Sequence, residues 1–218
     1  MKVYDYILFD LDGTLTEPAE GITNSIKYAL EKCGISGVMT EELLKFIGPP
    51  LRDTFMGFYN FSEEDAEKAV AYYREYFSAK GIFENRVYDG IPELLDKLKQ
   101  KGKKLLVATS KPEKFTNQIL EHFDLAKYFE FAAGATMDNS RDKKADIIQY
   151  ALENIQEKDY DRVIMVGDRH YDIDGAIANH IDSVGVLYGY GTKEELTKAG
   201  ATYIVSSVKE LEKLTLNI

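Results

Sequence analysis

Two aspartates, Asp10 and Asp12, follow an apolar stretch, and Asp12 stands directly before Gly13. Alternate residues of a strand point to opposite faces, but a glycine lets the chain turn sharply, so both carboxylates can approach one point. One carboxylate could then act as a nucleophile, and the other as a general acid and base that protonates a leaving alkoxide. The alternative is a solvated turn, in which the pair Asp-Gly is common.

A second acidic group follows another apolar stretch. Asp168 comes directly after the run Val163–Gly167, and Asp172 follows four residues later at the opening of an expected helix. With Asp10, these carboxylates would form a cluster of hard oxygen ligands, which Mg²⁺ prefers. Capping of the helix is the alternative role for Asp172.

Two further segments are candidates for binding a phosphoryl group. Thr109 and Ser110 end an apolar strand, and Pro112 fits a helix start, where a hydroxyl and backbone amides can bind an anion. Lys144 begins another expected helix, where a cation opposes the helix dipole and so indicates a bound anion nearby. Lys143 competes with Lys144 for this role, and a solvated basic patch is the alternative for both.

The hydrophobic pattern predicts the elements that position these residues. Six short apolar or β-branched stretches have the character of buried strands, and helical periodicity lies between the later ones. Thr192 with Glu195, and Ser207 with Glu210, have the spacing of capping boxes at helix starts. The alternation predicts an α/β fold, a Rossmann-like parallel sheet with helices on both faces. The expected strands are Tyr6–Phe9, Lys104–Thr109, Phe129–Ala133, Val163–Val166, Val184–Leu187 and Tyr203–Val205.

The stretch between the first two strands is different, because residues 16–84 show helical patterns and no convincing strand. A block of this length is not a usual crossover between strands. We therefore expect residues 1–15 and 85–218 to form the catalytic core, and residues 16–84 to form an inserted all-α domain. Within the insert, a rigid turn contains Gly48 and precedes Arg52, and a plain interhelix turn with a solvated Arg52 is one interpretation of it. Glu17, beside the first linker, is expected to contact a helix end rather than substrate.

The bulk composition excludes several classes of partner. The chain has 218 residues and a formal net charge of −10, which disfavours binding to nucleic acid or to an anionic membrane. Cys33 is the single cysteine, so no internal disulfide can form and a reducing compartment is expected. The sequence contains neither a recognisable signal peptide nor an apolar run long enough for a membrane span, and this predicts a cytoplasmic protein. Gly189-Tyr190-Gly191 starts like a dinucleotide fingerprint, but Glu194 occupies the third glycine position, so we reject that interpretation.

Taken in order, the motifs resemble those of the haloacid dehalogenase superfamily of phosphohydrolases. The resemblance rests on Asp-Leu-Asp-Gly-Thr-Leu, a strand-ending Thr, a Lys before a later helix, and Gly-Asp with a second Asp four residues on. It covers nearly the whole chain. The helical insert is similar to the small cap domain of the branch that includes phosphoglycolate phosphatases and 5′-nucleotidase-like enzymes. In capped relatives such a loop faces the catalytic cleft, so the resemblance makes the turn at Gly48 the best candidate for selecting the leaving group, with Arg52 in contact with a substrate anion.

This resemblance implies a role for each motif residue. Asp10 would be the nucleophile and Asp12 the acid and base, while Thr109, Ser110 and Lys144 would bind the phosphoryl group. Mg²⁺ would be held by Asp10, the backbone carbonyl of Asp12, and Asp168, with Asp172 supporting the metal shell. Many relatives follow the Lys with a Pro-x-Pro pattern that this chain lacks, so the choice between Lys143 and Lys144 stays open, with Lys144 favoured.

The activity implied is a Mg²⁺-dependent phosphomonoesterase that acts on a small phosphorylated metabolite through an aspartyl phosphate. Nucleoside 5′-monophosphates and 2-phosphoglycolate are the favoured substrates, and a monomer or small homo-oligomer is expected. A phosphotransferase of the β-phosphoglucomutase type would use the same intermediate. The alternative from another class of function is a signalling module that accepts a phosphoryl group. Asp12 and the helical insert make this alternative less favoured.

Overall fold

The computed structural model describes residues 2–138, 140–155 and 160–217. The chain divides into two compact units, one made of residues 1–17 and 87–218 and the other of residues 18–86. The chain passes between them through two short strands, β2 (Thr16–Glu17) and β3 (Arg86–Val87), which pair as a two-stranded sheet. We describe each unit by itself.

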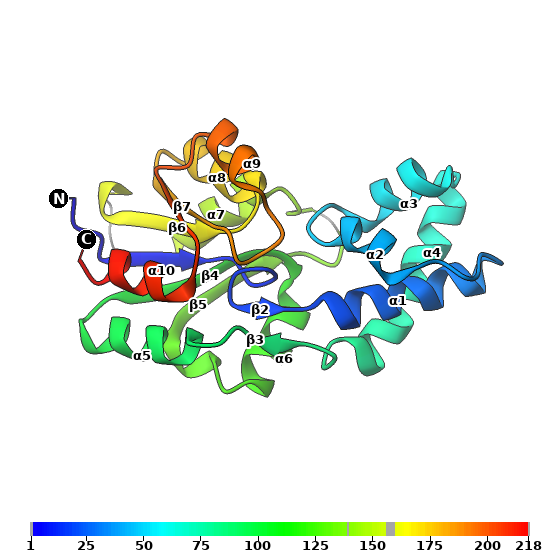
Figure 1. Cartoon of the computed structure of the whole chain (residues 1–218), viewed down its shortest axis with the longest axis horizontal. Helices are drawn as coiled ribbons and strands as arrows, with labels where there is room; N and C mark the ends of the chain where they lie inside the picture. Colours follow the sequence, from blue (N-terminus) through cyan, green and yellow to red (C-terminus); the bar gives the residue numbers. More distant parts are fainter. Residues whose placement is uncertain (1, 139, 156–159, 218) are drawn as a thin grey trace. The chain divides into compact units, whose positions relative to one another are not determined.

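The first unit is built on a parallel six-stranded sheet with the order β5-β4-β1-β6-β7-β8 (Figure 1). All six strands expected from the sequence are present, so the predicted α/β fold is confirmed. One boundary matters for function, because β4 continues through Pro112 and does not end at Thr109 as expected. The strands are β1 (Tyr6–Phe9), β4 (Lys104–Pro112), β5 (Phe129–Ala135), β6 (Val163–Gly167), β7 (Asp182–Val186) and β8 (Tyr203–Val205).

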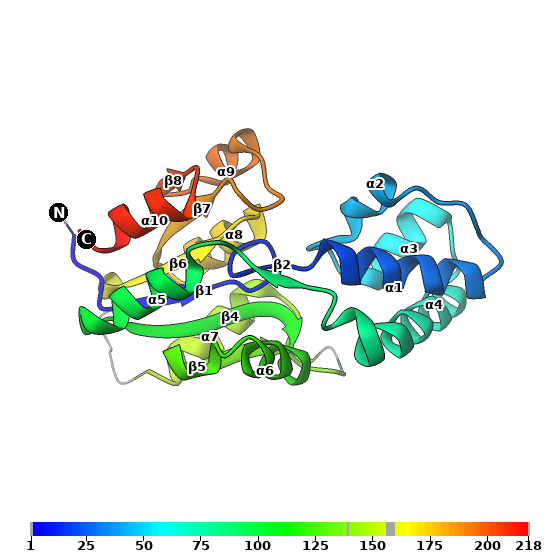
Figure 2. The same cartoon turned by 60° about the horizontal axis from the view of Figure 1, so that its bottom comes forward.

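Helices cover both faces of this sheet (Figures 1 and 2). One face packs against α7 (Lys144–Glu153) and α8 (His170–Ala178), with Leu8, Leu106 and Met165 contributed by the strands. These three side chains are almost completely buried, and burial of each contributes about 1.5–3 kcal/mol. The other helices of this unit are α5 (Ile91–Gln100), α6 (Glu113–His122), α9 (Lys193–Ala199) and α10 (Val208–Thr215), with short 3-10 turns at Ala126–Tyr128 and Tyr160–Arg162.

Two of the helices begin where the sequence has capping-box spacing, and the described contacts show the N-cap hydroxyl half of each box. The hydroxyl of Thr192 accepts a hydrogen bond from the Glu195 N–H at the start of α9 (3.1 Å). Ser207 does the same for the Glu210 N–H at the start of α10 (3.2 Å). Each cap satisfies one of the N–H groups that a helix leaves unpaired in its first turn.

The second unit is helical, as the sequence pattern predicts. It contains α1 (Ala19–Lys32), α2 (Thr40–Leu43), a 3-10 turn (Leu44–Phe46), α3 (Leu51–Tyr59), α4 (Glu63–Tyr76) and a π-helical turn (Phe77–Gly81). Phe46 and Phe55 are buried, and their ring centroids lie 5.2 Å apart in an edge-to-face contact. The π-helical turn passes very close to α1, since a Cβ at Gly21 would lie 1.9 Å from the Gly81 carbonyl oxygen. None of the helices in the described ranges is both long and apolar enough to span a bilayer.

Candidate active site

The register of the central strands brings three loops to one edge of the sheet. Phe9 at the end of β1 pairs with Val107 of β4 and with Val166 of β6. The Asp10 N–H donates to the Val166 carbonyl oxygen (2.9 Å), which fixes the backbone where β1 ends. Because the carboxyl ends of parallel strands meet at one edge, the residues that follow these strands lie side by side there, where open α/β sheets bind ligands.

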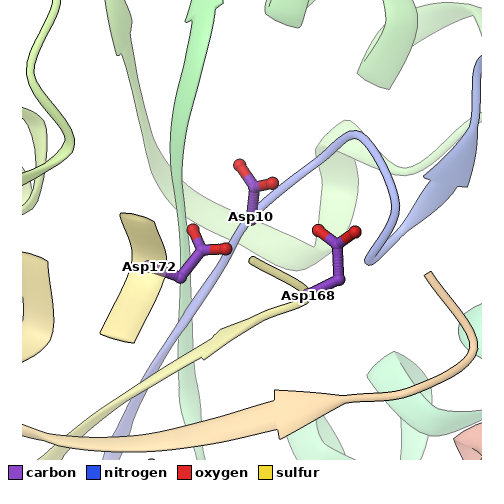
Figure 3. Close-up of side chains that lie close together, drawn as sticks. All are labelled: Asp10, Asp168 and Asp172. Carbon is purple, nitrogen blue, oxygen red and sulfur yellow. The ribbon is translucent and has the colours of Figure 1, made fainter. Parts of the chain in front are cut away.

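Three aspartates converge at this edge. Each of Asp10, Asp168 and Asp172 offers a carboxylate oxygen, and the three oxygens lie within 4.8 Å of one another. Figure 3 shows the side chains pointing toward a common space from β1, β6 and α8. All three residues are buried, being 8%, 0% and 1% exposed respectively. Buried carboxylates this close repel one another unless cations lie among them.

Lys144 supplies one such cation at the first residue of α7. Its Nζ lies 2.6 Å from Asp10 Oδ1 and 2.7 Å from Asp172 Oδ1, and it donates to the Ala108 carbonyl oxygen at 2.8 Å. These partners use the three donors that an ammonium group has. Burial lowers the pKa of Lys144, but the carboxylates of Asp10 and Asp172 outweigh it and hold that pKa above its ordinary value. Lys143 is exposed, so the structure brings Lys144 and not Lys143 into the cluster.

The pKa values of Asp168 and Asp172 are both raised above the ordinary value of an aspartate. Burial, followed by the charges of Asp172 and Asp10, raises the pKa of Asp168 well above its usual range. Burial also raises the pKa of Asp172 to about 6, although Lys144 opposes the shift. Asp172 Oδ2 accepts a hydrogen bond from the Arg169 N–H (3.1 Å), so this residue caps α8 as well as joining the cluster.

Asp12 has a lysine of its own, which sequence reasoning missed. The Nζ of Lys111 lies 2.7 Å from Asp12 Oδ2, and the Lys111 side chain is only 6% exposed. Burial raises the pKa of Asp12, and the charge of Lys111 opposes the shift. The signal was present in the sequence: Lys111 stands two residues after Thr109, and such residues share a face wherever a strand continues.

The two hydroxyls predicted to bind phosphate differ in their surroundings. Thr109 is buried within β4, three residues before the strand ends, and its Oγ1 accepts a hydrogen bond from the Lys111 N–H (3.3 Å). Ser110 is exposed. Both stand beside the edge that carries the aspartates, and their contact with a phosphoryl group stays a prediction.

The rejected dinucleotide motif has a structural role in the acidic cluster. The Tyr190 N–H donates to Asp168 Oδ2 (2.8 Å). A Cβ at Gly189 would lie 2.3 Å from the Gly13 carbonyl oxygen, and a Cβ at Gly191 would lie 1.8 Å from the Asp168 carbonyl oxygen. Side chains at these positions would collide with backbone, so the glycines are what allows this loop to approach Asp168.

Glu17 and the two candidates in the helical unit have other surroundings. Glu17 Oε1 accepts a hydrogen bond from the Tyr190 hydroxyl (2.7 Å), a partner that the sequence did not indicate. Gly48 has a φ of +107°, which favours glycine, in the turn before α3. Arg52 lies on α3 with its Nη2 3.1 Å from Glu63 Oε1, and both side chains are exposed. A role for Gly48 and Arg52 in choosing the substrate stays a prediction.

Comparison with known proteins places this geometry in a family. The family model described as haloacid dehalogenase-like hydrolase matches residues 7–186, a range that contains all four aspartates and both lysines of the site. The chain belongs to the haloacid dehalogenase-like hydrolase family. A 5′-nucleotidase of Pseudomonas aeruginosa is 42% identical over 211 residues, which make up 97% of this chain and 95% of that protein.

Other relatives of this haloacid dehalogenase-like chain also match over nearly its full length. The tyrosine-protein kinase PtkA of Mycobacterium tuberculosis is 39% identical over 211 residues, covering 95% of this chain and 71% of PtkA. A crystal structure described as that of a predicted phosphatase from Clostridium acetobutylicum is 55% identical, with a TM-score of 0.94 over 99% of this chain and 100% of that one. These matches identify the chain as a haloacid dehalogenase-like phosphatase.

Proposed function

We propose that this phosphatase is a Mg²⁺-dependent phosphomonoesterase that hydrolyses nucleoside 5′-monophosphates through an aspartyl phosphate on Asp10. The observation that carries the proposal is the convergence of the Asp10, Asp168 and Asp172 carboxylates beside Lys144, with Asp12 two residues from the nucleophile. A single edge of the sheet then offers a nucleophile, an acid and base, and a place for a cation.

Two features of the described residues fit a divalent cation. Asp168 Oδ1 is buried and has no hydrogen-bond partner in the described part of the chain, so it is an orphaned anionic ligand. Among the described residues, the four carboxylates of Asp10, Asp12, Asp168 and Asp172 form ion pairs with two ammonium groups, those of Lys111 and Lys144, and the charge of Arg169 acts on Asp168 from farther away. Two negative charges therefore remain when all these groups are ionised, and a divalent cation would balance them.

The ligands for Mg²⁺ would come from Asp10, the Asp12 backbone carbonyl and Asp168, with Asp172 supporting them. When bound, the ion supplies positive charge that stabilises the negative oxygens of the transferring phosphoryl group. Hard oxygen donors of this kind suit Mg²⁺ better than the softer transition metals.

The proposed reaction follows from the roles of the two catalytic aspartates. Asp10, held by Lys144, attacks phosphorus, and the phosphorus–oxygen bond to the leaving group breaks as the aspartyl phosphate forms. Asp12 gives its proton to the departing oxygen. Asp12 then takes a proton from the water that attacks the aspartyl phosphate, so phosphate is released and the Asp10 carboxylate is restored. Thr109, Ser110 and Lys144 would hold the phosphoryl oxygens during both steps.

The favoured substrate class rests on the relatives and on the cations of the site. The Pseudomonas 5′-nucleotidase is 42% identical, whereas phosphoglycolate phosphatases of Vibrio parahaemolyticus and Agrobacterium fabrum are 27% and 32% identical. A 2-phosphoglycolate substrate brings an extra carboxylate, but Lys111 and Lys144 are already paired with aspartates. A neutral nucleoside leaving group has no such carboxylate and requires no further cation. We propose residues 16–84 as the cap domain that selects it, with the turn at Gly48 and Arg52 in contact with the substrate.

A substrate panel tests this function. Phosphate release is measured from nucleoside 5′-monophosphates, 2-phosphoglycolate, a hexose 1-phosphate and pyrophosphate, each with Mg²⁺ and with EDTA. We expect the highest kcat/KM for a nucleoside 5′-monophosphate and loss of turnover in EDTA. An isomerised sugar phosphate in place of free phosphate would instead indicate a mutase.

The nucleophile is tested separately by Asp10→Asn. The change keeps the size of the side chain, so we expect turnover to fall to background with little change in far-UV circular dichroism. Undiminished phosphate release by a folded Asp10→Asn variant would contradict the proposed reaction.

A further inference from the structure

An ion pair with Lys111 holds the side chain of Asp12. Its Oδ2 lies 2.7 Å from the Nζ of Lys111. Its Oδ1 is buried and finds no hydrogen-bond donor within the ranges that the structure describes. The Lys111 side chain is 6% exposed and that of Asp12 is 18% exposed, so water competes for this ion pair less than it would for a pair at the surface, and the carboxylate is held more firmly.

The backbones on both sides of this contact are already held in place. The Gly13 N–H, next to Asp12, donates to the Thr16 carbonyl oxygen (2.8 Å). The Lys111 N–H donates to Thr109 Oγ1 (3.3 Å), and the next residue, Pro112, pairs with Ala135 of β5. Rotation of the Asp12 side chain is therefore the main freedom left, and Lys111 limits it.

Lys144 does not duplicate this contact. Its three donors are directed to Asp10, Asp172 and the Ala108 carbonyl oxygen. The site therefore contains two separate pairs, Asp10–Lys144 and Asp12–Lys111, one for each catalytic aspartate.

We infer that Lys111 is a positioning residue for Asp12, holding its carboxyl group where it protonates the leaving oxygen and later deprotonates water. The inference rests on the proposed phosphomonoesterase reaction. In the first step the proton passes from Asp12 to the departing oxygen, and in the second it passes from water to Asp12. Lys111 keeps its own protons throughout and acts only through the geometry of Asp12.

A role in proton transfer to the leaving group has a distinctive kinetic signature. A nucleoside departs as an alkoxide that needs a proton, whereas p-nitrophenolate is a stable anion that departs without one. The ratio kcat/KM reports the steps up to formation of the aspartyl phosphate. Misplacing Asp12 should therefore lower kcat/KM for a nucleoside 5′-monophosphate and spare p-nitrophenyl phosphate.

The test compares Lys111→Met with the wild-type protein on AMP and on p-nitrophenyl phosphate. We expect kcat/KM for AMP to fall by about a hundredfold, and for p-nitrophenyl phosphate by less than about threefold. Lys114→Met is the matched control, since it removes the same charge from an exposed position three residues away. Lys111→Arg, which keeps the cation, should restore most of the AMP activity. Should Lys111→Met fail to fold, Lys111→Gln takes its place.

The same substitution in an Asp12→Asn background separates positioning from direct contact with the substrate. If Lys111 acts through Asp12, adding Lys111→Met to the Asp12→Asn variant should leave the ratio of kcat/KM for AMP to kcat/KM for p-nitrophenyl phosphate unchanged. Equal losses on both substrates, or an undiminished effect in the Asp12→Asn background, would overturn the inference. Failure of the wild-type protein to hydrolyse either substrate would instead count against the proposed function.

Discussion

Replacing Asp168 with Asn should stabilise the metal-free protein and abolish its response to magnesium. Asp168 is fully buried: its Oδ2 accepts the Tyr190 N–H at 2.8 Å, and its Oδ1 has no partner among the residues described. Burial and the charges of Asp172 and Asp10 hold the pKa of Asp168 well above its usual range. An Asn keeps an oxygen for Tyr190, and its amide can donate to the neighbouring carboxylates.

The size of the effect follows from the orphaned oxygen. A buried polar group without a partner costs about 1–3 kcal/mol, and more when it is charged. We expect Asp168→Asn to raise the free energy of unfolding in EDTA by a similar amount, which for a chain of this size raises Tm by about 2–10 °C.

The increase in unfolding free energy that we expect from Asp168→Asn should also depend on pH. Because the pKa of Asp168 is higher in the folded than in the unfolded state, the folded wild-type protein holds a proton that the unfolded chain has lost. Its stability is then greatest at acid pH and declines as the pH rises through the folded pKa. The advantage of the Asn variant should therefore grow as the pH rises from about 4, the ordinary pKa of an aspartate, until the raised pKa of Asp168 in the folded protein is passed.

Scanning calorimetry in EDTA and in excess Mg²⁺ measures both effects. The wild-type Tm should rise with Mg²⁺, because a ligand that binds only the folded state stabilises it, whereas the variant should respond little. Asp172→Asn is the contrasting control: it weakens the contact with Lys144 at 2.7 Å and should destabilise the protein in EDTA. Two results would refute the reasoning. One is an Asp168→Asn variant that is less stable than the wild-type protein in EDTA at alkaline pH, and the other is a variant whose Tm rises with Mg²⁺ as much as the wild-type Tm does.

Two further substitutions test the loop at Asp168 and the helical unit. Gly189→Ala would place a Cβ 2.3 Å from the Gly13 carbonyl oxygen, so it should reduce both phosphate release and the Mg²⁺-dependent rise in Tm; full retention of both would contradict the role of this glycine. Ser62→Ala removes the oxygen that accepts the Asp65 N–H (3.1 Å) at the start of α4 and should cost about 1 kcal/mol in urea unfolding, with Ser78→Ala, at an exposed position, as a near-neutral control.

The sheet could be predicted because its signals are local. Each strand is a short apolar run between polar turns, and the chemistry-bearing residues directly follow β1 and β6. Since parallel strands end at one edge, the order of motifs was enough to predict that Asp10 and Asp168 would meet. The measured separation of their oxygens, within 4.8 Å, confirms that they meet.

The contacts that complete the site could not be predicted because they depend on tertiary pairing. The strand β4 continues through Pro112 because β5 pairs with it there, and only this extension presents Lys111 to Asp12. Likewise, nothing near Tyr190 in the sequence indicates that its N–H will bind a carboxylate 22 positions earlier. Periodicity predicts where a strand lies, but its last residues and the loops beyond it are set by neighbours distant in the chain.

The position of Lys144 shows that the protein itself can supply the anions that a sequence signal indicates. A lysine at the first residue of α7 opposes the helix dipole, at a cost of about 0.3–1 kcal/mol, and this predicts a bound anion nearby. The structure shows that the protein supplies the anions itself, in the carboxylates of Asp10 and Asp172 at 2.6 and 2.7 Å. Because both contacts are buried, they outweigh the dipole penalty and keep the lysine charged. In the proposed reaction, a phosphoryl group that binds Lys144 would therefore share a cation already paired with Asp10, and this would bring the phosphorus next to the proposed nucleophile.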